Sequence, residues 1–218
     1  SATQRIRKGN FVIVDGTRGE VVVDPDPPSV TRYEVEQRRQ HELSRQLQQL
    51  KNLAAETLDH HAVRLMANIE LPGEVPSVIA HGANGVGLFR TEFLYLNRGD
   101  FPTEEEQYEA YRAVAEQVKP HAVIIRTMDL GGDKFLSPLQ LPPEMNPFMG
   151  WRAIRFSLAR PDIFRIQLRA ILRASVHGHL KLMYPMITGL EELRRANEIL
   201  REVRQELAKE GVSMADKI

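Results

Sequence analysis

The sequence lacks cysteine entirely, although it is 218 residues long. This absence excludes disulfides, cysteine-ligated metals and a cysteine nucleophile within the chain. No run of about 18 apolar residues and no signal-peptide pattern occurs, so we expect a cytoplasmic protein without membrane insertion. Excess charge of one sign is also missing, because 29 basic residues balance 29 acidic ones. We therefore expect neither nucleic acid nor an anionic membrane as a partner.

The residues that are present are typical of a globular protein. Apolar residues make up 42% and charged residues 27% of the chain, which are ordinary values for a folded domain. The length allows one large domain, or one and a half ordinary ones. The chain starts at Ser1 without a methionine and stops in "SMADKI" with no closing element, so we expect a fragment of a longer protein.

A hairpin followed by a helix is predicted for the first 60 residues or so. Residues 11–25 hold two β-branched runs, "FVIV" and "EVVV", around the turn sequence "DGTRG". From about Ser29 to Leu58 the sequence is charged, Gln-rich and free of Gly and Pro. An apolar stripe at helical spacing runs through Leu43, Leu47, Leu50 and Ala54. This stripe predicts a connecting helix or, as the alternative, a coiled-coil seam.

After about Ala62, strand-like apolar runs alternate with helical patterns in four units. Unbroken strand–helix alternation predicts a parallel α/β sheet with right-handed crossovers. Two architectures fit, a doubly wound sheet and a (β/α)8 TIM-type barrel, and both place ligands at the carboxyl ends of the strands. No G-x-G-x-x-G follows a strand, which weakens a dinucleotide-binding interpretation. Four units would form half of a barrel.

Two predicted strands end in an arginine at the same place. In "GVGLFRTEFLY" and "HAVIIRTMDLGGDK", Arg90 and Arg126 follow an apolar run and precede a threonine and a carboxylate. Burying a guanidinium is costly unless an anion or acceptors surround it, so two of them on one rim would converge on phosphate or carboxylate. The alternative is internal pairing, with Glu92 and Asp129 neutralising the arginines. Arg152, at the start of a later helix, would add a third positive group.

The loop after the third predicted strand supplies weaker candidates. In "DLGGDK", the glycine amides and Lys134 would reach the same rim, although the spacing of a Walker A loop is missing. Glu92, Asp129 and Asp133 have the chemistry of Mg²⁺ ligands. Acids beside arginines are more often ion-pair partners, so we expect no metal site within this chain.

Three stretches connect the chain to a known family, namely "GVGLFRTEFLYLNRGDFPTEEEQYEAY", "VIIRTMDLGGDK" and "NPFMGWRAIR". Through them the chain closely resembles the enzyme I family of the bacterial sugar phosphotransferase system, whose members are phosphoenolpyruvate–protein phosphotransferases. The likeness covers nearly the whole chain. It implies that residues 61–218 are the N-terminal half of a (β/α)8 barrel that binds phosphoenolpyruvate (PEP). Residues 1–28 would be the last hairpin of a swivelling phosphohistidine domain, and 29–60 a linker helix.

The same resemblance implies roles for individual residues. Arg90 and Arg126 match the family's arginines that hold the phosphate of PEP, and Arg152 matches a supporting arginine. The phosphorylated histidine would precede residue 1, whereas the Mg²⁺ ligands and an acid cysteine would follow residue 218. The parent protein, expected to be a homodimer, would transfer phosphate from PEP to its histidine and then to a histidine-containing phosphocarrier protein. We expect this chain to bind substrate phosphate at most.

Other interpretations stay open. A relative of pyruvate phosphate dikinase or PEP synthase would share the Arg-Thr-Glu pattern, and a non-enzymatic adaptor would use the helix as a coiled coil. Half of a barrel would leave two open sheet edges and an apolar inner face. We therefore expect the fragment to self-associate or to cover that face with its own linker.

Overall fold

The computed structural model describes residues 5–96, 98–130 and 150–218, and the chain forms two compact units, Ser1–Leu53 and Ala54–Ile218. The first unit contains a hairpin of β1 (Val12–Asp15) and β2 (Glu20–Val23), paired antiparallel. The Asp15 carboxylate accepts from the backbone N–H of Thr17 at 2.9 Å, which closes the turn. The structure thus contains the hairpin that "DGTRG" predicts.

The predicted connecting helix is α2 (Pro27–Leu50), which begins and ends earlier than the expected range of Ser29–Leu58. It begins earlier because proline is compatible with the first helical turn, where no N–H partner is needed. The Asp26 carboxylate caps this turn by accepting from the backbone N–H of Ser29 at 2.9 Å. Hydrogen bonds from the side chain and the backbone N–H of Ser29 lower the pKa of Asp26. Ala54, the last member of the predicted apolar stripe, lies beyond the end of the helix.

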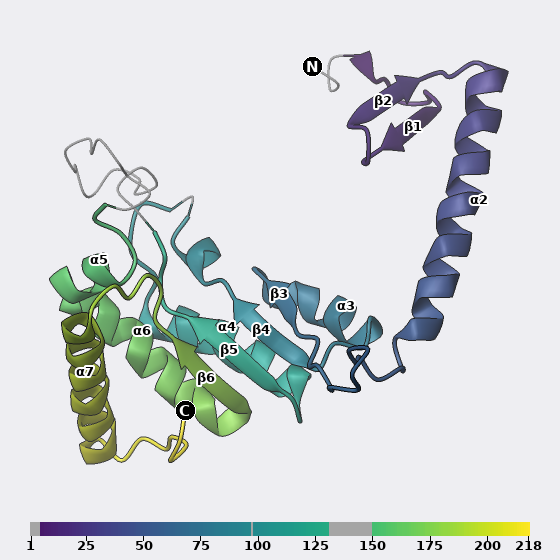
Figure 1. Cartoon of the computed structure of the whole chain (residues 1–218). Helices are drawn as coiled ribbons and strands as arrows, with labels where there is room; N and C mark the ends of the chain where they lie inside the picture. The colour runs from purple at the N-terminus through teal and green to yellow at the C-terminus, as the bar shows by residue number, and fades with distance from the viewer. Residues whose placement is uncertain (1–4, 97, 131–149) are drawn as a thin grey trace. The chain divides into compact units, whose positions relative to one another are not determined.

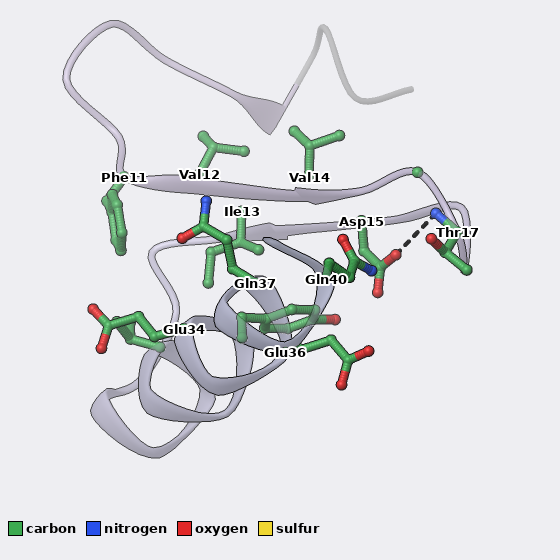
Figure 2. A pocket seen from close by; sticks show the side chains of 13 residues that line it. Phe11, Val12, Ile13, Val14, Asp15, Thr17, Glu34, Glu36, Gln37 and Gln40 are labelled. Carbon is green, nitrogen blue, oxygen red and sulfur yellow. Dashed lines mark hydrogen bonds between the residues drawn. The ribbon is translucent and has the colours of Figure 1, made fainter. Parts of the chain in front are cut away.

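A pocket lies between the hairpin and α2 (Figure 2). Phe11 and Ile13 point toward the helix, whereas Val14 points away from it. The Tyr33 hydroxyl donates to the Glu20 carboxylate at 3.0 Å and so ties the helix to β2. Phe11 remains 57% exposed and Val14 72% exposed, so this unit leaves much of its apolar surface in contact with water.

The second unit is built on a parallel four-stranded sheet in the order β3-β4-β5-β6 (Figure 1). This sheet confirms the predicted α/β class with parallel strands. β3 and β6 are its two edge strands. The strands are β3 (Ala67–Ile69), β4 (Gly85–Phe89), β5 (Ala122–Arg126) and β6 (His179–Met183). The helices are η1 (Pro72–Glu74), α3 (Val75–Ala80), η2 (Glu92–Leu94), α4 (Glu104–Val118), α5 (Ile154–Ala159), α6 (Pro161–Ala174), η3 (Ser175–His177) and α7 (Leu190–Lys209).

Local signals set several helix ends. Thr103 caps α4, because its hydroxyl accepts from the backbone N–H of Glu106 at 3.2 Å while the Glu106 carboxylate accepts from the Thr103 N–H at 2.7 Å. Pro161 separates α5 from α6 and occupies the first turn of α6. Gly211 follows α7 with a φ of 73°, which glycine adopts readily. Among the described residues, no helix is long and apolar enough to span a membrane.

The core lies between one face of the sheet and the helices α3, α4 and α6. Tyr111 of α4 is fully buried and meets Phe89 edge to face, with ring centroids 6.0 Å apart. α6 also packs against α7 in a second apolar cluster. The sheet contributes Ile69, Val86, Phe89, Val123, Ile125 and Leu180 to the first cluster.

The opposite face of the sheet carries polar side chains where β6 contributes to it. Side chains alternate along a strand, so the residues between the buried ones face away from the helices. In β6, Leu180 and Leu182 contact the core, whereas His179 and Lys181 are exposed. In β6 this face therefore carries His179 and Lys181 together with the apolar Met183, so polar side chains interrupt the expected apolar inner face there.

Candidate functional site

The strand register brings both predicted arginines to one rim. Ile69 pairs with Phe89 and Phe89 pairs with Ile125, so the residues that follow these three also lie side by side. Neighbouring strands are about 4.8 Å apart. The residues in this row are Glu70, Arg90, Arg126 and Met183, the last two paired directly. The sheet thus places Arg90 and Arg126 at equivalent positions on adjacent strand ends.

Arg126 is held by two carboxylates. Its Nη2 lies 3.0 Å from Oε1 of Glu92, and its Nη1 lies 3.0 Å from Oδ2 of Asp129. The three side chains are between 13% and 19% exposed, so water screens these pairs only partly. Glu92 also accepts from the backbone N–H of Asp129 at 3.0 Å. The internal pairing expected as the alternative is therefore present at Arg126.

Arg152 joins the same cluster through Asp129. Its Nη2 lies 2.9 Å and its Nε 3.2 Å from Oδ1 of that carboxylate, so Asp129 connects Arg152 to Arg126. Ala153, next in the chain, has a φ of 54° that alanine rarely adopts. Its N–H donates to the carbonyl of Leu130 at 3.1 Å, which fixes this unusual turn beside the site.

Arg90 has a different partner from the one expected. Its Nη1 lies 2.7 Å from Oε1 of Glu70, the residue that directly follows β3. The expected partner was Glu92. The pair is open to solvent, since the Arg90 side chain is 40% and the Glu70 side chain 54% exposed. Exposed pairs of this kind contribute only about 0–1 kcal/mol. Of the three arginines, Arg90 is thus the one that another anion can engage most easily.

The two strand-end arginines share a feature that the ion pairs leave unexplained. The Nε atoms of Arg90 and Arg126 are buried and have no hydrogen-bond partner in the part of the chain that the structure describes. A buried donor without an acceptor is costly. A phosphate or carboxylate at this rim would supply the missing acceptors, because its oxygens match the forked donors of guanidinium.

Sequence reasoning missed two residues that organise this rim, Glu70 and Gln167. Glu70 could have been found from its position, because it ends the first strand as Arg90 and Arg126 end the next two. Gln167 of α6 is 1% exposed and accepts from the backbone N–H of Met128 at 2.9 Å. Gln167 could have been found from the sequence, because it is a polar residue inside the apolar stripe of an otherwise amphipathic helix.

The described residues do not suit a Mg²⁺ ion. They contain no group of three or more carboxylate or histidine side chains that could hold a metal. Two of the three candidate ligands are already engaged: Glu92 accepts from Arg126, and Asp129 accepts from Arg152. The third candidate, Asp133, and the proposed contributions of the "DLGGDK" glycines and Lys134 lie outside the described residues.

Comparison with known proteins gives a consistent picture. Residues 44–218 match the family described as PEP-utilising enzyme, PEP-binding domain. All 218 residues align at 47% identity with the phosphoenolpyruvate-protein phosphotransferase of Staphylococcus carnosus strain TM300. The proteins of the same name from Staphylococcus aureus and Geobacillus stearothermophilus are 48% identical over the same length. The chain spans 38% of the length of each of these relatives.

Proposed function

Because the chain belongs to the PEP-utilising enzymes through their PEP-binding domain, we propose that it binds PEP at the carboxyl ends of β4 and β5. Arg90 and Arg126 would grip the phosphate, and Arg152 would support them from the far side of Asp129. The proposal rests on one observation above the others. Two guanidinium groups at matching strand ends each keep a buried Nε without an acceptor.

The two arginines would contribute in different ways. Arg126 is fixed by Glu92 and Asp129, so it would present its free N–H groups with little loss of side-chain entropy. Arg90 would exchange the exposed Glu70 for the ligand. Phosphoryl transfer depends mainly on positioning and on neutralising charge at the transferred group. Two neighbouring guanidinium groups that bind one phosphate would supply part of the positioning and part of the charge neutralisation.

The wider proposal concerns the longer protein. We propose that the sheet is half of a (β/α)8 barrel, with residues 61–218 as its first half, 29–60 as a linker and 1–28 as the end of a phosphohistidine domain. That protein would use Mg²⁺, held by ligands that the family resemblance places after residue 218. It would act in the cytoplasm as a homodimer and pass phosphate to a phosphocarrier protein for sugar uptake. The isolated chain would bind without turnover.

Titration calorimetry with PEP, and with oxalate as an analogue, tests the proposal. We expect weak saturable binding by the chain and a loss of at least about tenfold in the Arg90→Ala, Arg126→Ala double variant. Arg195→Ala is the matched control, because it removes an exposed arginine that pairs with Glu198 on α7. Equal binding by the double variant and the control would overturn the assignment.

A non-enzymatic adaptor remains a second candidate because of α2. Its three leucines Leu43, Leu47 and Leu50 are 55%, 55% and 56% exposed, as an unpaired coiled-coil seam would be. Light scattering on residues 1–58 separates the two candidates. An adaptor requires this piece to dimerise alone, whereas the substrate-binding proposal predicts a monomer. The dikinase or synthase alternative loses support, because the whole chain aligns with phosphotransferases.

A further inference from the structure

A buried network of polar side chains lies behind the arginine rim, and Gln167 of α6 is at its centre. The Gln167 side chain forms hydrogen bonds with three different segments of the chain. Its Oε1 accepts from the backbone N–H of Met128, beyond β5, at 2.9 Å. Its Nε2 donates to the Thr91 hydroxyl, beyond β4, at 3.2 Å and to the Tyr111 hydroxyl of α4 at 3.1 Å. One amide therefore links both strand ends that carry the arginines.

The direction of every bond in this network is determined. A backbone N–H can only donate, so the Gln167 atom facing Met128 must be the oxygen. The amide nitrogen then donates to Thr91, whose own hydroxyl hydrogen is free to donate to the carbonyl of Arg126 at 3.0 Å. Thr91 directly follows Arg90, so the chain of bonds runs from Gln167 through the neighbour of one arginine to the backbone of the other.

The far side of the network is anchored in α4. The Tyr111 hydroxyl donates to Oε1 of Gln107 at 3.1 Å, and the Tyr95 hydroxyl donates to the same oxygen at 3.1 Å. The Gln107 amide nitrogen donates to the carbonyl of Pro102 at 3.2 Å. Burial raises the pKa of Tyr111 and of Tyr95, so both phenols stay protonated and remain donors. The network is thus closed, with each amide oxygen and nitrogen partnered.

We propose that Gln167 is a positioning residue for the anion site: it sets the relative placement of Arg90 and Arg126 by holding the backbone that follows each of them. This inference rests on the proposed function, because it concerns the same two arginines. Gln167 does not touch the ligand. It acts through Thr91 on one strand and through Met128 on the other, and Thr91 joins the two strands directly.

A residue with a merely structural role would affect stability without affecting the ligand. Leu168→Ala provides that comparison, because Leu168 is the next residue of α6 and lies in the apolar cluster shared with α7. Gln167→Met keeps the approximate volume of the side chain and removes all three hydrogen bonds. Thr91→Val removes only the hydroxyl, whereas Thr91→Ser retains it. This last pair keeps the test decisive if Gln167→Met fails to fold.

The first readout is the PEP affinity of the 218-residue chain by calorimetry. We expect Gln167→Met and Thr91→Val to weaken binding by about tenfold, and Thr91→Ser and Leu168→Ala to stay within about twofold. Binding by Thr91→Val at the level of Thr91→Ser would overturn the proposal. Equal losses in Leu168→Ala and Gln167→Met would overturn it as well, because the effect would then follow stability.

The second readout needs no ligand and separates this inference from the proposed function. In ¹⁵N relaxation spectra, the Nε–H group of Arg126 reports how rigidly its guanidinium is held. We expect its order parameter to fall in Gln167→Met and Thr91→Val, and to remain unchanged in Thr91→Ser. An unchanged order parameter in all variants would overturn the positioning role. If the unaltered chain does not bind PEP but these variants still loosen Arg126, only the proposed function fails.

Discussion

Replacing Glu70 by glutamine should increase the affinity for PEP. Glu70 forms an ion pair with the Arg90 guanidinium, at 2.7 Å from Nη1. A ligand that engages Nη1 of Arg90 must compete with this carboxylate. Glutamine keeps the size of the side chain but has no charge, so it competes less and repels an approaching anion less.

The size of the effect follows from the exposure of the pair. The two side chains are 40% and 54% exposed, which limits the pair to about 0–1 kcal/mol. If the ligand no longer has to break this pair, its binding free energy improves by the same amount, which is a gain in affinity of up to about fivefold. The free energy of unfolding should change by less than about 0.5 kcal/mol, because exposed substitutions rarely do more.

Calorimetry with PEP at low and high salt, together with urea unfolding, provides the assay. The gain should shrink at high salt, because screening weakens exposed charge pairs. Glu198→Gln is the matched control, since it breaks an exposed pair with Arg195 away from the rim. Unchanged or weaker PEP binding by Glu70→Gln, with normal stability, would refute the view that Glu70 and the ligand compete for Arg90.

Three further predictions concern stability. Gly85→Ala should destabilise the fold by about 2–4 kcal/mol in urea unfolding, because a Cβ there would lie 2.5 Å from the carbonyl oxygen of Ala122 and φ is +123°. Ala153→Gly should stabilise it by about 1 kcal/mol, because glycine adopts a φ of 54° without strain, and a loss would contradict this. Hydrogen bonds from Thr103 lower the pKa of Glu106 below its ordinary 4.5, so this carboxylate stabilises the folded state above that pH and loses the effect as the pH falls. Glu106→Gln should therefore lower Tm more at pH 7 than at pH 3, and an equal loss at both would contradict the argument.

Most of the fold could be predicted because its signals are local. The start of α4 follows from Thr103 and Glu106, which are three residues apart, and the break between α5 and α6 follows from Pro161. The end of α2 could not be predicted, because no Gly or Pro marks the sequence after Leu50 and the apolar spacing continues to Ala54.

The site, too, could be predicted from the sequence only in part. The partners of Arg126 were expected because Glu92 and Asp129 belong to the same two motifs. The predicted partner of Arg90 was wrong, since Glu70 becomes its neighbour only through the pairing of β3 with β4. Gln167 was missed for a similar reason, because its contacts to Thr91 and Met128 depend on how α6 crosses the sheet. Distant partners require the topology, which local patterns do not contain.

The central claim is that two adjacent arginines grip one phosphorylated acid, and an NMR titration tests it most directly. The Nε–H signals of Arg90 and Arg126 come from two buried donors that lack an acceptor in the described structure. Upon addition of PEP, both signals should shift together and saturate at one concentration, while that of Arg195 stays in place. If only one of the two signals moves, or if neither does while PEP is in large excess, the two arginines do not form a common site.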